Sequence, residues 1–176
     1  MNQLDKDNLH KEIDLIQACI NRMANNSFLL KGWAISIIAV VLALSEKNIN
    51  PFFLCFVVLV PLISFWYLDA FFLYTEKLYR KMYEWVIQER PKSNADKMYD
   101  LNPHRFKNEL KIIKNGQDTD QIESEWSVMW SKTLKYFYFI PIVLVLTIMV
   151  ILSVSNFSSA EKAGSIKEIP SVTNKK

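Results

Sequence analysis

Apolar positions gather into three long stretches that hold almost no charge, at residues 28–45, 51–74 and 136–154. They have 18, 24 and 19 residues, and a helix needs about 20 apolar residues to cross a hydrocarbon core ~30 Å thick. The alternative, buried helices of a soluble protein, leaves too little polar chain to wrap three such stretches. The pattern therefore predicts three transmembrane helices. The first is expected to be retained rather than cleaved as a signal peptide, because its 27-residue leader holds four acidic side chains.

Lysine and arginine residues favour one orientation of these spans. Sixteen of the 21 lie in 1–31 and 75–135, and the other five lie in 46–50 and 155–176. Cytoplasmic segments of membrane proteins carry the excess of positive charge. The count predicts a multi-pass membrane protein with a cytoplasmic N-terminus and a C-terminus on the opposite side of the membrane.

Residues 1–27 show the period of an amphipathic cytoplasmic helix, and Asp7 or Asn8 is expected to cap it. Five apolar residues form a seam along one face of this helix: Leu9, Ile13, Ile16, Ile20 and Met23. Three interpretations stay open, namely packing on the protein's own helices, self-association between copies, or a helix on the membrane surface. The four acidic residues argue against the last, because membrane-surface helices favour Lys and Arg.

A helix is predicted to continue from the second span into the cytoplasm. The segment 52–90 forms one helix of about 39 residues, roughly 58 Å long. Pro91 stops this helix, because proline has no backbone donor and disfavours helical geometry in the residue before it. The second span therefore extends into a small cytoplasmic lobe formed by residues 75–135.

The rest of that lobe is predicted to be irregular over 91–119, with 109–114 as one helical turn or a short strand. Asp118 or Asp120 is expected to open a helix that runs straight into the third span. Residues 155–176 have the composition of a disordered tail. Together these elements predict an all-α integral membrane protein with three transmembrane helices, two of them extending into a small helical lobe.

Charge excludes some functions. The net charge is +3, and residues 75–135 hold twelve Lys and Arg against ten Asp and Glu, so nucleic acid is not an expected partner. Four basic residues of the lobe are a candidate contact for an anionic lipid or ligand: Arg105, Lys107, Lys111 and Lys114. The competing interpretation is a solvated basic face.

Catalytic patterns are missing from the sequence. His10 and His104 lie far from any partner at metal-ligand spacing, and three glycines leave no phosphate-binding loop. No pair of carboxylates stands at a convincing spacing for acid–base work. The sequence therefore predicts neither an enzyme nor a metal or cofactor site.

Two charges lie inside the spans, Lys31 near the start of the first and Asp69 near the end of the second. With the N-terminus inside, both fall near the cytoplasmic interface, at depths of about 5 and 8 Å. We expect them to pair, because an unpaired charge deeper in the bilayer costs ~2.5–3.5 kcal/mol. In the alternative, Lys31 snorkels alone, and Asp69 bonds Ser64, Trp66 or a tyrosine hydroxyl from another helix.

Three segments carry a resemblance to a family: INRMANNSFLLKGW (20–33), FWYLDAFFL (65–73) followed by EKLYR (76–80), and SKTLKYFY (131–138). In order and spacing over about 125 residues, the chain resembles an uncharacterised family of small three-span bacterial membrane proteins. Such proteins are found on mobile elements and near anti-phage defence genes. The resemblance implies a defence-linked membrane role and carries no active-site residues, and the segment 91–119 departs most from it.

Two functions compete at this stage. In the first, the chain is an accessory or effector of a defence system that forms homo-oligomers and perturbs the integrity of the inner membrane. In the second, it is a non-conducting membrane anchor that recruits a soluble cytoplasmic partner. The spans hold few polar uncharged residues, which argues against an aqueous channel that is open at rest.

Overall fold

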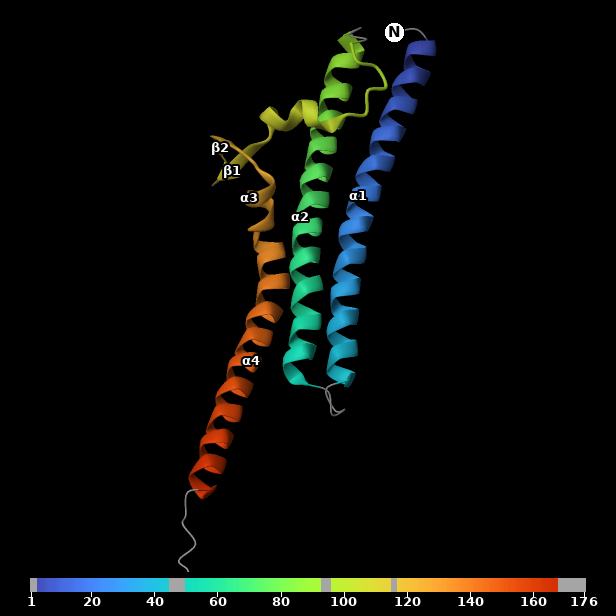
Figure 1. Ribbon diagram of the computed structural model, residues 1–176. Helices are drawn as coiled ribbons and strands as arrows, with labels where there is room; N and C mark the ends of the chain where they lie inside the picture. Colours follow the sequence, from blue (N-terminus) through green and yellow to red (C-terminus); the bar gives the residue numbers. More distant parts are fainter. Residues whose placement is uncertain (1–2, 45–49, 93–95, 115–116, 168–176) are drawn as a thin grey trace, which may run out of the picture.

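Three long helices dominate the computed structural model, which describes residues 3–44, 50–92, 96–114 and 117–167 (Figure 1). Helix α1 covers Gln3–Leu44, α2 covers Pro51–Glu89 and α4 covers Lys132–Lys167. Each of the three contains a segment that is long and apolar enough to cross a membrane. The predicted all-α class with three candidate spans is therefore confirmed.

Helix α1 joins the predicted cytoplasmic helix and the first span without a break over 42 residues. It already includes Gln3, so the predicted start at Asp7 or Asn8 is wrong. Asp5 lies in the first turn, where a carboxylate interacts favourably with the positive end of the helix dipole. No proline interrupts this segment, and the amphipathic half therefore passes directly into the apolar half.

Helix α2 has the predicted length of 39 residues. It begins where the side chain of Asn50 accepts a hydrogen bond from the backbone N–H of Phe52, with Pro51 at the first helical position. It ends at Glu89, and a short 3-10 helix, η1 (Arg90–Lys92), carries Pro91. In Figure 1 α2 lies between α1 and α4, so it is the helix on which both others pack.

The lobe differs from its predicted form in one region. Residues Lys111–Lys114 (β1) and Gln117–Ile122 (β2) form an antiparallel hairpin in place of a helix starting at Asp118 or Asp120. The Asn-Gly pair at 115–116, outside the described residues, is a sequence that favours a tight hairpin turn. The lobe is therefore not wholly helical, and 109–114 contains a strand rather than a helical turn.

The chain then re-enters helix in two steps rather than one. Helix α3 (Glu125–Met129) begins after Ser124, whose hydroxyl accepts a hydrogen bond from the N–H of Ser127 at 3.2 Å. Trp130 and Ser131 separate α3 from α4. A 3-10 helix, η2 (Pro103–Glu109), lies earlier in the lobe and packs on α2.

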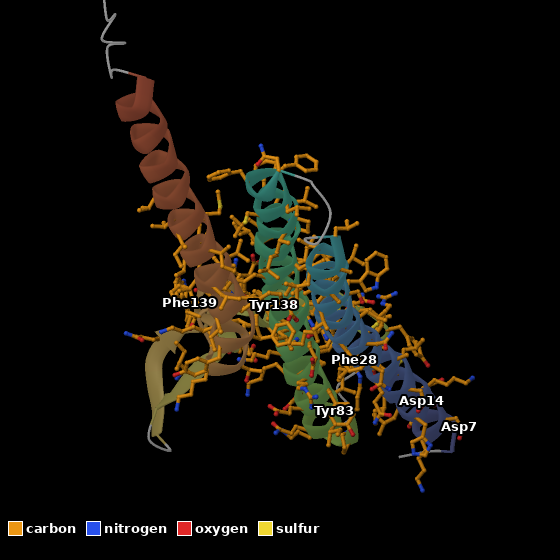
Figure 2. All side chains as sticks on the ribbon, turned by 90° about the horizontal axis from the view of Figure 1, so that it is seen from below. Asp7, Asp14, Phe28, Tyr83, Tyr138 and Phe139 are labelled. Atoms are coloured by element: carbon orange, nitrogen blue, oxygen red, sulfur yellow. The ribbon has the colours of Figure 1, made fainter. Side chains whose placement is uncertain are left out.

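Toward the C-terminal end of α4, this helix diverges from α1 and α2 (Figure 1). Leu134, Tyr138 and Ile142, spaced four residues apart, are buried against the other helices. In Figure 2 Tyr138 lies on the side of α4 that faces α2, whereas Phe139 lies on its other side. The helix continues to Lys167, so residues 155–167 of the predicted disordered tail are helical, and 168–176 lie outside the described residues.

Two apolar clusters hold the fold together. The lobe cluster joins α1, α2, η2 and α3 around Leu78, Met82 and Val86. The second cluster joins α1, α2 and α4 inside the candidate spans around Val58, Leu62 and Tyr138. In the lobe cluster, fully burying one aliphatic side chain away from water contributes about 1.5–3 kcal/mol. Helix α2 contributes to both clusters and therefore links the lobe to the spans.

Candidate functional site

The most concentrated polar site among the described residues is centred on Asp69 of α2. Its side chain is fully buried, and three side chains from two other helices donate to it. The hydroxyl of Ser27 donates to Oδ1 at 2.5 Å, Lys31 Nζ lies 2.6 Å from Oδ2, and the hydroxyl of Tyr138 donates to Oδ2 at 3.1 Å. One carboxylate therefore ties α1, α2 and α4 together.

Helix periodicity explains how the donors meet. Ser27 and Lys31 are four residues apart on α1, so their side chains lie on one face, and Lys31 Nζ also donates to Ser27 Oγ at 2.8 Å. Tyr138 lies on the buried face of α4 between Leu134 and Ile142. We call these four residues (Ser27, Lys31, Asp69 and Tyr138) the three-helix joint.

The predicted pairing of Lys31 with Asp69 is present in the structure. Part of the alternative is present as well, because Asp69 also accepts from a tyrosine of another helix. Ser64 and Trp66 take no part, since the Ser64 hydroxyl donates to the carbonyl of Val60 and the indole of Trp66 donates elsewhere. The joint combines the two interpretations rather than choosing between them.

Sequence reasoning missed Ser27 and Tyr138. Ser27 stands one helical turn before Lys31 and at the end of the polar run Asn25-Asn26-Ser27, which is a usable signal. Tyr138 stands among apolar residues at the start of a span, where a tyrosine is expected at the membrane interface. Its burial depends on which face of α4 meets α2, and this is a tertiary property.

Beside the joint, the lobe is fastened to α2 by an aromatic contact. The indole Nε1 of Trp66 donates to the carbonyl of Met129 at 3.0 Å. The rings of Trp66 and Trp130 meet edge to face, with centroids 5.4 Å apart. Lys77 of α2 pairs with Glu123 just before α3. These contacts place α3 against α2 directly before the chain enters α4.

The seam of α1 is occupied within the chain. Ile16 and Met23 are buried in the lobe cluster, and the partly buried Leu9, Ile13 and Ile20 pack against it. Of the three interpretations, packing on the protein's own helices is therefore observed. Self-association through these residues stays a prediction.

A second buried ion pair lies at the end of the molecule that carries the lobe. Arg90 grips Glu12 of α1 with two parallel hydrogen bonds, from Nε to Oε2 and from Nη2 to Oε1, both 2.7 Å long. The N–H of Tyr99, whose φ of 62° is left-handed, donates to Oε1 at 3.1 Å. The pair joins α1, the end of α2 and the loop before η2, across 78 residues of sequence.

Opposing effects set the protonation of this pair. Burial raises the pKa of Glu12, but the hydrogen bonds from Arg90 and Tyr99 and the nearby positive charges outweigh it, so the pKa is lowered from its ordinary value. The hydrogen bonds to Glu12 raise the pKa of Arg90 in turn, against the effect of burial. Both groups are therefore ionised at neutral pH.

The predicted basic cluster does not form one surface. Arg105 turns inward, lies within 3.4 Å of Asp100 and packs over the rings of Trp85 and Phe106. Lys107 and Lys111 are exposed to solvent, and the side chain of Lys114 lies outside the described residues. The interpretation as a solvated face fits Lys107 and Lys111, whereas Arg105 belongs to the interior of the lobe.

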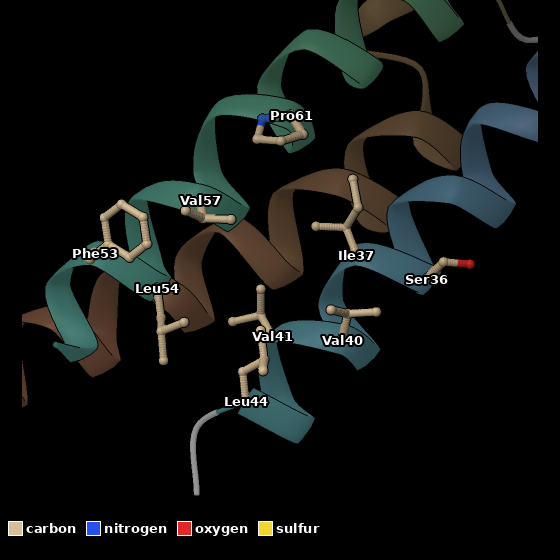
Figure 3. A pocket seen from close by; sticks show the side chains of 9 residues that line it. All are labelled: Ser36, Ile37, Val40, Val41, Leu44, Phe53, Leu54, Val57 and Pro61. Atoms are coloured by element: carbon tan, nitrogen blue, oxygen red, sulfur yellow. The ribbon is translucent and has the colours of Figure 1, made fainter. Parts of the chain in front are cut away.

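The cavities in the spans are apolar. One of about 360 Å³ lies between the C-terminal part of α1 and the N-terminal part of α2 (Figure 3). Ser36 is the one hydroxyl among its nine lining residues, and it donates to the carbonyl of Gly32 in its own helix. Such a wall offers a polar ligand no free partner, and lipid is its natural neighbour.

No group of His, Cys, Asp and Glu suited to a metal ion occurs among the described residues. No protein-family model, no curated protein and no solved structure matches the chain. The physical features therefore stand alone: three helices able to span a membrane, one buried carboxylate joining them, and a lobe packed on the central helix.

Proposed function

We propose that the chain is a small inner-membrane effector of a bacterial defence system, which self-associates and perturbs membrane integrity when its cytoplasmic lobe is engaged. The observation that carries this proposal is the way α4 is attached. The side chains that hold it to the other helices lie in its first half, at Leu134, Tyr138 and Ile142. Beyond them its apolar side chains are largely exposed, as at Leu144, 60% exposed, and Ile151, 61% exposed.

This attachment makes α4 the element that can move. Its polar contact within the spans is the bond from Tyr138 to Asp69, and the aromatic contact of Trp66 with Met129 and Trp130 lies immediately before it. A shift of the lobe along α2 therefore acts directly on the start of α4. Rigid helices that pivot about a short break are a common form of switching.

Self-association is proposed to use the free part of α4. Apolar side chains in a bilayer are already out of water, so the hydrophobic effect does not drive helices together there. They associate through close packing instead. The seam of α1 is already covered, whereas the exposed face of α4 from Val143 to Val154 is open to a neighbouring copy. The defence role and the inner-membrane location are supported by the resemblance described above and by the distribution of Lys and Arg.

The second candidate function is a non-conducting anchor for a soluble partner, and one observation favours it. The hydroxyls of Ser36, Ser64 and Thr147 each donate to the carbonyl four residues earlier in their own helix. Within the described parts of the spans, these groups are therefore not free to line a water-filled path. The anchor needs no such path, whereas the effector needs α4 to rearrange before it acts.

One experiment separates the two functions. The wild-type chain and Asp69→Asn, which removes the negative charge that Lys31 and Tyr138 bind, are expressed at equal levels while membrane potential is followed with a dye. The effector proposal expects depolarisation that is stronger or earlier for Asp69→Asn. Ser64→Ala is the control, because that hydroxyl bonds only its own helix in the structure. An unchanged potential with normal growth for all three contradicts the effector and favours the anchor.

Orientation has its own test. A reporter fused after Lys176 is expected to give a periplasmic signal, and one inserted near Asn115 a cytoplasmic signal. Opposite signals at both sites contradict the charge argument. A cytoplasmic signal at both sites means that the third segment does not cross the membrane.

A further inference from the structure

We infer that the cytoplasmic lobe holds a binding site for an oxyanion, a phosphate or carboxylate group of a small soluble molecule, at the free edge of the Arg105 guanidinium. This inference goes beyond the proposed effector role, because it concerns binding to the lobe whether or not the membrane leaks.

The primary observation is a pair of unsatisfied donors. Nε and Nη2 of Arg105 are buried and have no hydrogen-bond partner in the part of the chain that the structure describes. A buried donor without a partner costs about 1–3 kcal/mol, and more when it is charged. Such a group in a folded protein calls for an explanation, of which an absent ion or water is the usual one.

The two nitrogens are on the edge of the guanidinium that binds oxyanions. Nε–H and Nη2–H point in parallel, so together they match the two oxygens of a carboxylate or phosphate. The neighbouring Arg90 uses the same two atoms to hold Glu12 at 2.7 Å. In Arg90 the edge formed by Nε and Nη2 binds a carboxylate, whereas in Arg105, which pairs with Asp100 through Nη1, the same edge has no partner among the described residues.

The surroundings hold Arg105 in position. Its guanidinium carbon lies 5.0 Å from the centre of the Trp85 ring and 4.8 Å from that of Phe106, and Arg90 lies 5.2 Å from the same Trp85 ring. Stacking on aromatic rings fixes the plane of a guanidinium while leaving its edge available. Asp100 is paired with the other side through Nη1, at 3.4 Å, and does not occupy this edge.

The height of the site favours a soluble source over a lipid headgroup. Trp85 stands eleven residues beyond Tyr74, the last residue of the predicted second span, which is about 16 Å along the helix. The headgroup layer adds only about 5–8 Å on each side of the hydrocarbon core. Exposed Lys107 and Lys111 in and beside η2 add positive charge that attracts a soluble anion to this part of the lobe.

Entry of the anion must change the lobe. Both free nitrogens are shielded from solvent, so a ligand reaches them by displacing part of the surface above them. Loop residues Lys97 and Tyr99 close to this region have left-handed φ values of 53° and 62°, a conformation that costs non-glycine residues energy. Binding is therefore expected to be accompanied by local exposure of the backbone between η1 and η2.

The test uses the full-length chain in nanodiscs of neutral lipid. Inorganic phosphate and citrate are titrated calorimetrically against chloride at matched ionic strength, and hydrogen exchange of residues 96–110 is followed in parallel. We expect saturable binding of at least one oxyanion in the millimolar range, with faster exchange in this segment. Absence of saturable binding by both anions overturns the inference, and a buried water then fills the edge.

Variants of two basic residues identify the site. Arg105→Lys keeps the charge but loses the fork, and is expected to weaken binding about tenfold or more. Lys107→Gln removes an exposed charge next to the site and is expected to change affinity less than about threefold, because exposed charges contribute little. Equal affinity of wild type and Arg105→Lys overturns the inference. Binding that requires anionic lipid in the nanodisc overturns the soluble source.

Discussion

Two buried ion pairs hold this molecule together, and they are built differently. At the end of the molecule that carries the lobe, Arg90 binds Glu12 through two parallel hydrogen bonds, and both side chains are at most 4% exposed. In the three-helix joint, Lys31 approaches Asp69 as a single point charge with 23% of its side chain exposed, and two hydroxyls complete the carboxylate. In the first pair one arginine binds the carboxylate through two hydrogen bonds of fixed geometry, whereas in the second one carboxylate accepts from three separate side chains.

The difference indicates which parts of the molecule are fixed and which can change. A bidentate arginine has little freedom once it is bound, so α1, α2 and the loop before η2 form one unit. A lysine ammonium can rotate and reach neighbouring groups, and Tyr138 contributes a single hydrogen bond from α4. We therefore expect the Glu12–Arg90 pair to dominate stability, and the joint to govern how firmly α4 is held.

The largest effect is expected at the Glu12–Arg90 pair. Glu12→Ala leaves Arg90 buried without its anion and is expected to lower the free energy of unfolding by about 3–5 kcal/mol. Unfolding is measured in detergent by the fluorescence of Trp85, which stacks on Arg90, in a chain whose other tryptophans are replaced. Glu84→Ala, which breaks an exposed pair with Lys81, is the control and is expected to cost less than about 1 kcal/mol. Equal costs for both variants contradict the distinction.

The joint comes next. Asp69→Asn and Lys31→Gln are each expected to destabilise the protein; for the lysine left without its partner near the interface, the loss is expected to stay below the ~2.5–3.5 kcal/mol that an unpaired charge costs at the bilayer centre. The double variant is expected to lose less than the sum of the two, because each single change leaves one unpaired group behind. Stability and membrane insertion of the four chains form a double-mutant cycle. Strictly additive losses would show that the two charges act independently, which contradicts the interpretation of the joint as one unit.

A smaller effect is expected at the hydroxyl from α4. Tyr138→Phe keeps the buried ring and removes one hydrogen bond to a charged acceptor. The free energy of unfolding is therefore expected to fall by at most about 1.5–3 kcal/mol. Cysteine crosslinking between the part of α2 near Asp69 and the start of α4, in a chain without Cys19 and Cys55, then reports whether α4 moves away. Tyr136→Phe, an exposed position two residues earlier, is the control. Crosslinking that is unchanged in Tyr138→Phe contradicts a role of this hydroxyl in holding α4.

The smallest effect concerns pH. Because the pKa of Glu12 is lower in the folded protein than its ordinary value of 4.5, the ionised carboxylate stabilises the fold. That contribution is complete above about pH 5 and is lost as the pH falls through the lowered pKa. Thermal unfolding between neutral pH and about pH 3 is expected to show this acid-side loss. Glu12→Gln has nothing to titrate there, so an identical pH profile in this variant contradicts the assignment.

The sequence alone determined the elements whose signal is local. Three stretches of 18 to 24 residues with almost no charge predict the three spans, and a proline at 91 predicts the end of α2. The pairing of Lys31 with Asp69 also followed from the sequence, because antiparallel neighbouring spans bring two charges of similar depth together. The spans and the end of α2 could be predicted because each depends on a local property, namely the length of an apolar run or the restricted backbone of a proline.

Tertiary structure decided the rest, because those features depend on segments that are far apart in the chain. Glu12 and Arg90 are 78 residues apart, and nothing local marks either as buried. The apolar pattern of the α1 seam would be the same whether it packed on α2 or on another copy of the chain. In the structure it packs on α2, in the cluster around Met82. The helix predicted at Asp118 gave way to β2, since pairing with β1 supplies its backbone hydrogen bonds. Likewise, only the packing of α4 on α2 turned Tyr138 from an interface residue into a donor to Asp69.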